Sequence, residues 1–357
     1  MERLRVAIIG TGGVAGSHMN AWDDCKDRLN RVAAVDIDEE RVSAFANKHG
    51  IPHSYADVGE MLREQQPDLV HIATPPSLHA QQILQCLEAG AHVLCEKPLV
   101  GSLRQLDLIA EAEQRSGRFC CSVVQWRFGS AGQQIRRLID SGTFGRHTVS
   151  ICATTWYRDD AYYAVPWRGT WASELGGVSM GQAIHLIDLM LWLNTPWRDV
   201  TAITETLDHD IEVEDASLAM VRFEDRSVAS VISSVVSPRQ ETRLRLDFQR
   251  ATAEVVALYR HRNANWTITP VAGTELPAGT WPPETDLESN HGAQLAMMLD
   301  VLEAGRRPPA GTDDIRPTIE FLSALYKSGM TGAPVERGSI GPGDPFYDHV
   351  SGRVNPA

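Results

Sequence analysis

Residues 4–16 read Leu-Arg-Val-Ala-Ile-Ile-Gly-Thr-Gly-Gly-Val-Ala-Gly, an apolar run followed at once by a glycine-rich turn. A second apolar run, Val32-Ala33-Ala34-Val35, ends in Asp36. A βαβ unit that holds the pyrophosphate of a dinucleotide needs this order of strand, glycine turn, helix, strand and acid. The opening of the chain therefore predicts a nucleotide-binding βαβ unit.

The individual positions of this unit have separate physical roles. Gly10 permits the tight turn, Gly12 lets phosphates approach the backbone, and Ala15 lets the helix pack closely on the strand. The helix N-terminus then directs free N–H groups at the anion. A carboxylate at Asp36 can accept hydrogen bonds from both ribose hydroxyls and would repel a 2′-phosphate, so the pattern favours NAD over NADP. Arg41 lies near enough to leave some room for NADP.

The composition excludes several classes of partner. At 357 residues, with 43% hydrophobic and 22% charged residues, the chain is an ordinary soluble globular protein long enough for two domains. A formal net charge of −13 argues against nucleic acid and against anionic membrane surfaces. No apolar run approaches the ~20 residues that span a bilayer.

The six cysteines are scattered and show no C-x-x-C and no Cys/His spacing suited to a metal. Such cysteines are typical of reduced core residues, so we expect a cytoplasmic location and no metal site. The first strand also begins too early to leave space for a secretory signal.

Strand and helix patterns alternate over the first part of the chain. The predicted strands are 4–9, 32–35, 51–55, 68–74, 92–96 and 119–125, and the predicted helices include 60–66, 78–89 and 102–116. This rhythm indicates a doubly wound parallel sheet covered on both faces, with ligands at the carboxyl ends of its strands. Those ends carry Thr74-Pro75-Pro76-Ser77, Glu96-Lys97-Pro98 and Gln125-Trp126-Arg127.

The alternation of strands and helices ends after Arg127. Longer strands at 147–156, 217–223, 227–236, 243–248 and 252–258 follow one another, with one strong helix near 179–194 and later helices at about 290–304 and 313–329. Consecutive strands with short links imply a large open antiparallel sheet in an α+β domain. We therefore expect a Rossmann domain at 1–125, an α+β domain at 126–335, and an irregular C-terminal arm at 336–357.

Lys97 is the sharpest single candidate for chemistry. It lies just past a buried strand, on the edge where a dinucleotide would lie, and Pro98 restricts the backbone after it. A partly desolvated ammonium beside a nicotinamide would have a lowered pKa suited to proton transfer or to polarising a hydroxyl. The alternative is a surface ion pair between Lys97 and Glu96.

A second candidate lies on the mostly apolar helix 179–193. Its polar residues Ser179, Gln182, His185 and Asp188 recur at intervals of three and form one stripe. A polar stripe on a buried helix needs partners, which either a substrate pocket or an internal hydrogen-bond network could supply.

A third candidate is the aromatic segment just before that helix. It runs from Trp156-Tyr157-Arg158-Asp159-Asp160-Ala161-Tyr162-Tyr163 to Trp167-Arg168-Gly169-Thr170-Trp171. Rings interleaved with donors and acceptors suit a sugar, whose CH faces stack on aromatic rings. The same composition also occurs at protein interfaces.

These pieces, in this order, resemble the Gfo/Idh/MocA oxidoreductase family. The similarity is carried by the glycine turn, Ala73-Thr74-Pro75-Pro76-Ser77-Leu78-His79, Glu96-Lys97-Pro98, Gly176-Gly177 through Ile184-His185-Leu186-Ile187-Asp188, His291-Gly292-Ala293-Gln294 and Gly332-Ala333-Pro334-Val335. It implies a Rossmann domain, a second domain whose sheet mediates homodimers or homotetramers, and NAD as cofactor, with NADP the weaker alternative.

The resemblance also implies roles for individual residues. Lys97 would be the catalytic lysine and His185 the acid/base histidine. The expected cofactor-binding residues are Gly10, Gly12, Gly13, Val14, Ala15, Asp36, Ile37, Arg41, Thr74, Pro75, His79, Glu96, Lys97 and Arg127. The expected substrate-binding residues are Arg127, Tyr157, Tyr163, Trp167, Arg168, Trp171, Gln182, His185, Asp188 and His291.

One position departs from the family pattern. Gly181 stands four residues before His185, where many family dehydrogenases carry an aspartate and some sugar-nucleotide members an asparagine. A glycine can neither relay a proton nor orient a hydroxyl, so Gln182 or Asp188 would have to compensate.

The expected function is hydride transfer between NAD and a secondary hydroxyl of a sugar, sugar derivative or cyclic polyol such as inositol. Two alternatives stay open. Tightly bound, recycled NAD could support a keto-sugar-mediated glycoside hydrolase, lyase or epimerase. The chain could also be a non-catalytic regulator that binds NAD or sugar.

Overall fold

The computed structural model describes residues 3–353, which form two compact units. The first unit combines the chain up to Val123 with His291–Arg316, and the second combines Val124–Asn290 with the chain from Pro317 onward. The helix α9 (His291–Glu303) thus belongs to the first unit, whereas the sequence analysis placed it in the second domain. The reason is packing, because Leu295 and Met298 of α9 share a buried core with Trp22 of α1 (Ala15–Asp24).

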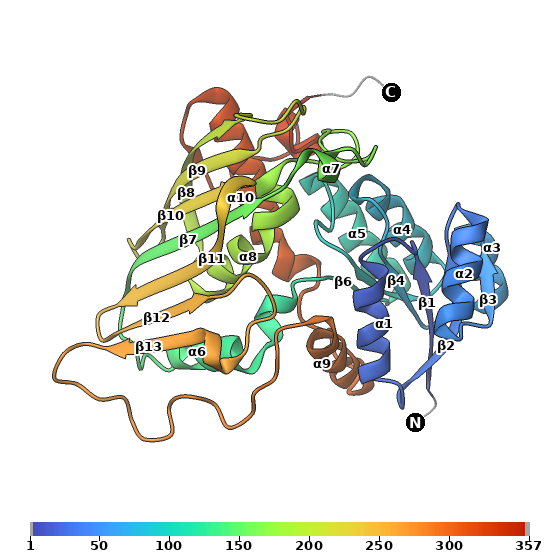
Figure 1. The fold of residues 1–357 in the computed structure, drawn as a ribbon, viewed down its shortest axis with the longest axis horizontal. Coiled ribbons are helices and arrows are strands. Elements are labelled where there is room, and N and C mark those ends of the chain that lie inside the picture. The colour runs from blue at the N-terminus through green and yellow to red at the C-terminus, as the bar shows by residue number, and fades with distance from the viewer. Residues whose placement is uncertain (1–2, 354–357) are drawn as a thin grey trace. The chain divides into compact units, whose positions relative to one another are not determined.

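The first unit is built on a parallel sheet with the strand order β3-β2-β1-β4-β5-β6 (Figure 1). Its strands are β1 (Leu4–Ile9), β2 (Leu29–Val35), β3 (His53–Tyr55), β4 (Leu69–Ile72), β5 (His92–Cys95) and β6 (Cys120–Ser122). Its other helices are α2 (Glu39–His49), α3 (Val58–Gln65), α4 (His79–Glu88) and α5 (Leu103–Ser116), with a 3₁₀ turn η1 (Pro76–Leu78). All five strand pairs are parallel, which confirms the predicted doubly wound fold.

The last strand of this sheet is shorter than predicted. The stretch expected as one strand, 119–125, contains β6, and Gln125–Phe128 form a 3₁₀ turn (η2) that belongs to the second unit. The N–H of Val123 still donates to the carbonyl of Cys95, and the chain then leaves the sheet. Buried apolar runs look alike in a strand and in a buried turn, so the sequence pattern could not separate them.

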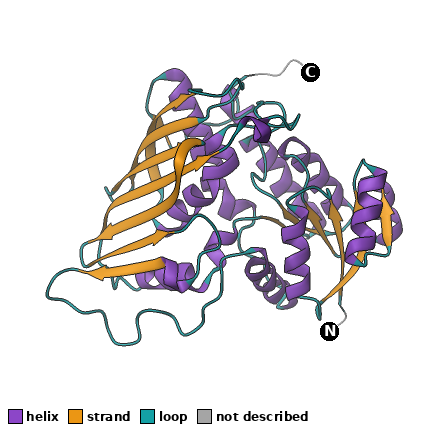
Figure 2. Ribbon diagram, in the orientation of Figure 1, coloured by secondary structure: helices purple, strands orange, loops and turns teal. Residues whose placement is uncertain are grey.

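The second unit is built on a sheet with the strand order β13-β12-β11-β7-β10-β9-β8-β14. The strands are β7 (His147–Tyr157), β8 (Trp197–Glu205), β9 (Ala216–Phe223), β10 (Val228–Ser234), β11 (Val236–Phe248), β12 (Ala251–Val256), β13 (Trp266–Pro270) and β14 (Val335–Glu336). All neighbouring pairs are antiparallel except β7 and β10, which confirms the predicted open antiparallel sheet with one exception. Figure 2 shows the helices of this unit gathered on one face of the sheet.

Several elements of the second unit differ from the sequence expectation. Helix α6 (Ser130–Asp140) and strands β8 and β13 were not predicted. The helix expected over 179–194 begins with a π-helical turn, Ser179–Ala183 (η3), and continues as α8 (Ile184–Leu193). A π turn adds a residue to each turn of the helix, so the regular three-residue spacing of the polar stripe does not hold at its start.

The C-terminal part is more ordered than an irregular arm. Helix α10 (Thr312–Thr331) is followed by β14, which pairs with β8, and by α11 (Pro345–Asp348), with α7 (Asp160–Tyr163) completing the helices of the second unit. Residues 354–357 of the predicted arm lie outside the described residues. Between residues 3 and 353, no helix combines the length and apolar character needed to cross a membrane.

Candidate active site

The glycine turn of the first unit has the geometry of a phosphate cradle. Gly10 has φ +89°, and a Cβ there would lie 2.7 Å from the carbonyl atoms of Ala73, so only glycine fits. Gly12 and Gly13 are exposed, and a Cβ on either would meet no described atom within 4 Å. Helix α1 follows directly, and its N-cap residue Val14 makes no side-chain capping bond. The exposed backbone and uncapped helix start fit the pyrophosphate of a dinucleotide.

Asp36 lies at the end of β2 with its carboxylate already engaged. Oδ2 accepts hydrogen bonds from the Thr11 N–H at 2.9 Å and hydroxyl at 2.8 Å, and Oδ1 pairs with the Arg41 guanidinium at 2.5 Å. Burial alone would raise the pKa of Asp36, but Arg41 and Thr11 outweigh it and hold that pKa below its usual value. Asp36 is therefore an anionic acceptor with a cation beside it, while the neighbouring Ile37 is exposed.

His79 joins two of the predicted cofactor-binding turns. Its Nδ1 lies 2.8 Å from the carbonyl oxygen of Pro98, and its Nε2 lies 2.9 Å from that of Thr74. The ring is fully buried, and burial lowers its pKa. Both ring nitrogens thus contact backbone, so His79 holds the Thr74 turn against the turn that follows Lys97. Its predicted contact with the cofactor stays a prediction.

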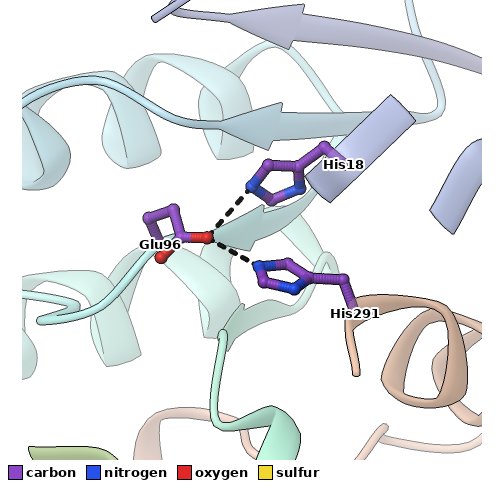
Figure 3. A group of neighbouring side chains, drawn as sticks. All are labelled: His18, Glu96 and His291. Carbon is purple, nitrogen blue, oxygen red and sulfur yellow. Dashed lines mark hydrogen bonds and ion pairs between the residues drawn. The ribbon is translucent and has the colours of Figure 1, made fainter. Parts of the chain in front are cut away.

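Glu96 is the centre of a buried polar cluster (Figure 3). Its Oε1 lies 2.8 Å from Nε2 of His291 and 3.3 Å from Nε2 of His18, and its Oε2 accepts the backbone N–H of Lys97 at 3.2 Å. Burial opposes ionisation, but the two imidazoles hold the pKa of Glu96 well below its usual value. A pair between Glu96 and Lys97 at the surface, the alternative considered from the sequence, is wrong because Glu96 is 5% exposed.

In the second unit, a buried carboxylate anchors the start of the His185 helix. Glu214 accepts the N–H groups of Gly177 at 3.0 Å and Ser179 at 2.9 Å, and the hydroxyl of Tyr326 at 2.9 Å. Burial raises the pKa of Glu214, and these donors offset only part of that effect. A Cβ on Gly177 would lie 1.8 Å from the carbonyl oxygen of Glu214, so glycine is required for this approach.

His185 lies in an aromatic setting. Its ring stacks on Trp126 with centroids 5.2 Å apart, and its Nε2 lies 3.0 Å from the hydroxyl oxygen of Tyr259. His185 is 4% exposed. The hydrogen bond to Tyr259 fixes which ring nitrogen faces the phenol and leaves Nδ1 for other partners.

Asp188 and Arg127, both predicted to bind substrate, bind each other. Nε of Arg127 donates to Oδ2 of Asp188 at 2.7 Å, its NH2 donates to Oδ1, and the hydroxyl of Thr318 donates to Oδ1 at 2.8 Å. Both charged side chains are buried. This bidentate pair anchors α8 and engages both carboxylate oxygens of Asp188, and its compensation for Gly181 stays a prediction.

A different carboxylate lies beside Gly181. A Cβ on Gly181 would lie 3.5 Å from Oε1 of Glu174, which is 4% exposed. Glu174 pairs with Arg168 at 3.1 Å and accepts the N–H of Gly169 at 2.7 Å. Glu174 was not among the predicted residues, because nothing in its sequence neighbourhood distinguishes it from a surface acid.

The polar residues around Glu174 form a connected group. Arg168 donates to the hydroxyl of Tyr162, which also accepts a hydrogen bond from Nε2 of Gln182 at 2.7 Å. The guanidinium of Arg168 lies over the rings of Tyr162 at 3.7 Å and Trp167 at 4.2 Å. The structure therefore joins three predicted substrate residues: Tyr162 connects Arg168 with Gln182, and Arg168 lies over the ring of Trp167.

The remaining predicted substrate residues are placed less uniformly. Trp171 is buried, and its indole N–H donates a hydrogen bond to the carbonyl oxygen of Glu212 at 3.0 Å. Tyr163 is half-buried against Tyr162, and Tyr157 is 47% exposed. His291 belongs to the first unit, where its Nε2 lies 2.8 Å from Oε1 of Glu96. Lys97 belongs to the first unit and His185 to the second, so their joint action on one substrate stays a prediction.

Comparison with known proteins identifies both units. The model of the oxidoreductase family with an NAD-binding Rossmann fold, Gfo/Idh/MocA, matches residues 4–124. The model of the Gfo/Idh/MocA C-terminal domain matches residues 133–254.

Relatives with known activities span most of the chain. The chain is 26% identical to D-apiose dehydrogenase of Paraburkholderia graminis, covering 95% of this chain and 91% of the relative. It is 27% identical to scyllo-inositol 2-dehydrogenase (NADP⁺) of Bacillus subtilis, covering 66% and 73%. Among solved structures, the WlbA dehydrogenase of Bordetella pertussis, in complex with NADH and UDP-GlcNAcA, is similar with a TM-score of 0.85, 25% identity and coverage of 94% and 99%.

The Gly181→Asp variant should be destabilised because its carboxylate would face Glu174 in a buried setting. We expect the free energy of unfolding to fall by about 1–3 kcal/mol, and the double variant with Glu174→Gln to recover most of that loss. Chemical denaturation of the four proteins of this double-mutant cycle measures the coupling. Gly181→Ala is the matched control, since its methyl group makes only an ordinary contact. Equal losses for the Asp and Ala variants would contradict the placement of Glu174.

Proposed function

Because this chain belongs to the Gfo/Idh/MocA oxidoreductases, whose Rossmann domain binds NAD, we propose that it oxidises a secondary hydroxyl of a sugar, sugar derivative or cyclic polyol. The sugar and inositol dehydrogenases among its relatives support this substrate class. The observation that carries the proposal is the buried His185, which stacks on Trp126 and shares its helical segment with Gln182, a member of the polar group that also contains Arg168 and Glu174.

The polar group around Arg168 suits a polyhydroxylated ligand. It offers a guanidinium, a carboxylate, a phenol and an amide within one connected set. Vicinal hydroxyls need donors and acceptors side by side, and the ring of Trp167 offers an apolar face for sugar CH groups.

His185 and Lys97 have different roles: His185 accepts a proton, and Lys97 stabilises negative charge. When Nε2 of His185 donates to the oxygen of Tyr259, Nδ1 is the basic nitrogen that accepts the hydroxyl proton of the substrate. The Lys97 ammonium donates a hydrogen bond to the same substrate oxygen and stabilises the negative charge that develops there. NAD would supply the hydride acceptor, and the glycine turn and Asp36 would hold its pyrophosphate and a ribose.

Substitution of either catalytic residue tests this assignment. We expect His185→Asn and Lys97→Met each to lower kcat by roughly 10²–10⁴-fold while NADH affinity, measured by fluorescence titration, changes little. The assay is a screen of sugars and inositols with NAD and NADP that follows reduced cofactor and product side by side. His53→Asn, at an exposed histidine, is the control.

Two results of this screen would contradict the proposal. Product formed without net NADH would indicate recycled cofactor rather than a dehydrogenase. Near-full turnover of either catalytic variant would remove that residue from its role.

Asp36 should set the preference for NAD over NADP. Asp36→Asn removes the charge that opposes a 2′-phosphate, and Arg41 is already in place to bind it. We expect the ratio of kcat/KM for NADP to that for NAD to rise by at least about tenfold. The double variant with Arg41→Met should lose most of that gain, and an unchanged ratio in the single variant would contradict the role of Asp36.

We also propose that a second copy of the chain covers the outer face of the eight-stranded sheet. Ile203, Leu218 and Ile232 lie in register on β8, β9 and β10, and their side chains are 60%, 52% and 37% exposed. Met220 on β9 is 69% exposed. A contiguous apolar row on a sheet face is typical of an interface, and two-fold pairing would bury the same row on both copies.

Charges introduced into this row should separate the copies. We expect Leu218→Arg with Met220→Asp to convert a dimer or tetramer into monomers in sedimentation velocity, with unchanged far-UV circular dichroism. Arg222→Asp on the same strand, at the edge of the row, is the comparison variant. A wild type that sediments as a monomer at micromolar concentration would contradict the interface.

The cysteines support the expected cytoplasmic location. Cys25, Cys86, Cys95, Cys120, Cys121 and Cys152 are all buried free thiols, as expected in a reducing compartment.

A further inference from the structure

A chain of buried aromatic and polar side chains leads to Glu96 from the interior of the first unit. The indole N–H of Trp22 donates to Nε2 of His71 at 3.1 Å, and Nδ1 of His71 lies 2.9 Å from Nδ1 of His18. Nε2 of His18 then faces Oε1 of Glu96 (Figure 3). Trp22, His71 and His18 are each 0% exposed, so bulk water does not satisfy these groups. None of these three residues belongs to the residues predicted to bind cofactor or substrate.

The chemistry of Trp22 fixes every proton in this chain. An indole nitrogen can only donate, so Nε2 of His71 must accept. The proton of His71 therefore sits on Nδ1 and is donated to Nδ1 of His18. His18 accepts at Nδ1, so its proton sits on Nε2, the nitrogen that lies 3.3 Å from Oε1 of Glu96. Any other placement sets two N–H groups, or two lone pairs, against each other in a buried site.

Burial is consistent with this neutral arrangement of the two histidines. It lowers the pKa of His71 and His18, so both rings are uncharged at neutral pH. Glu96 then carries the negative charge of the chain, and His291 contacts it from α9.

The same proton order argues against a metal ion at this site. Nε2 of His18, Nε2 of His291 and a carboxylate oxygen of Glu96 lie within 4.8 Å of one another, a donor set that zinc would accept. However, a metal ligand needs a lone pair, and the chain from Trp22 leaves a proton on Nε2 of His18. A cation would have to displace that proton and reverse both tautomers against the indole N–H.

We propose that Trp22, His71 and His18 form a proton-ordered chain that holds Glu96 as an anionic acceptor and, through it, positions the backbone of Lys97. The link is the second oxygen of Glu96, which accepts the Lys97 N–H at 3.2 Å. Trp22, His71 and His18 are thus positioning residues, and this part of the inference rests on the proposed function of Lys97. The proton order itself does not depend on that function.

Histidine tautomers can be measured directly by long-range ¹H–¹⁵N NMR on protein labelled at its histidines. We expect the Nε2–H tautomer for His18 and the Nδ1–H tautomer for His71 at pH 7. In Trp22→Phe, we expect the ¹⁵N signal of His71 Nε2 to shift, because its lone pair has lost the indole donor, while Glu96 still favours the Nε2–H tautomer of His18. A wild type with His71 protonated at Nε2, or His18 protonated at Nδ1, would overturn the inference.

The same spectra test the metal alternative. Addition of one equivalent of Zn²⁺ alone should leave the His18 and His291 signals in place. Stoichiometric loss of the His18 Nε2 proton on adding Zn²⁺ would make the cluster a metal site and overturn the proposed order.

Kinetics test the positioning role. Trp22→Phe should lower kcat about tenfold, because a small displacement of Lys97 is costly, with KM for NAD within about twofold. Trp197→Phe is the matched control: this buried indole also donates one N–H, to the carbonyl of Pro317 in the second unit. Equal losses of kcat in the two variants would overturn the positioning role. If no substrate is turned over at all, the proposed function fails while the NMR experiment still decides the proton order.

Discussion

A buried carboxylate must be surrounded by donors, and this requirement shapes each functional part of the molecule. Glu96 pairs with two imidazoles and accepts the N–H of Lys97. Glu214 accepts the N–H groups at the start of the His185 helical segment. Asp188 forms an ion pair with the guanidinium of Arg127, and Glu174 forms one with the guanidinium of Arg168. An unpaired carboxylate in these places would cost several kcal/mol. Each acid therefore holds a specific segment in place.

The buried carboxylates of the two units hold different kinds of segment. In the first unit, the acid lies directly before Lys97, so the groups that satisfy the carboxylate also restrain the lysine's backbone. In the second unit, Glu214 anchors the start of one helical segment and Asp188 anchors its middle, with His185 between these two points. His185 is consequently held at two points of its helical segment, as its proposed role of presenting one ring nitrogen to a substrate requires.

Gly181 also lies beside a buried carboxylate. Glu174 brings its carboxylate next to the space that a side chain at 181 would enter. A second acid there would add a like charge to a buried site. The acid that lies next to position 181 thus comes from a residue seven positions earlier in the chain.

The sequence by itself determined what depends on neighbouring residues: the glycine turn, the acid after β2, the alternation of strands and helices, and the family motifs around Lys97 and His185. These are local because strand, turn and helix preferences act over a few residues. Only the tertiary structure decided which buried groups meet. His291 reaches Glu96 from 195 positions away, and α9 returns to the first unit after the strands β7–β13 of the second sheet. Such partners are selected by burial and donor geometry in three dimensions, which leave no periodic trace in the chain.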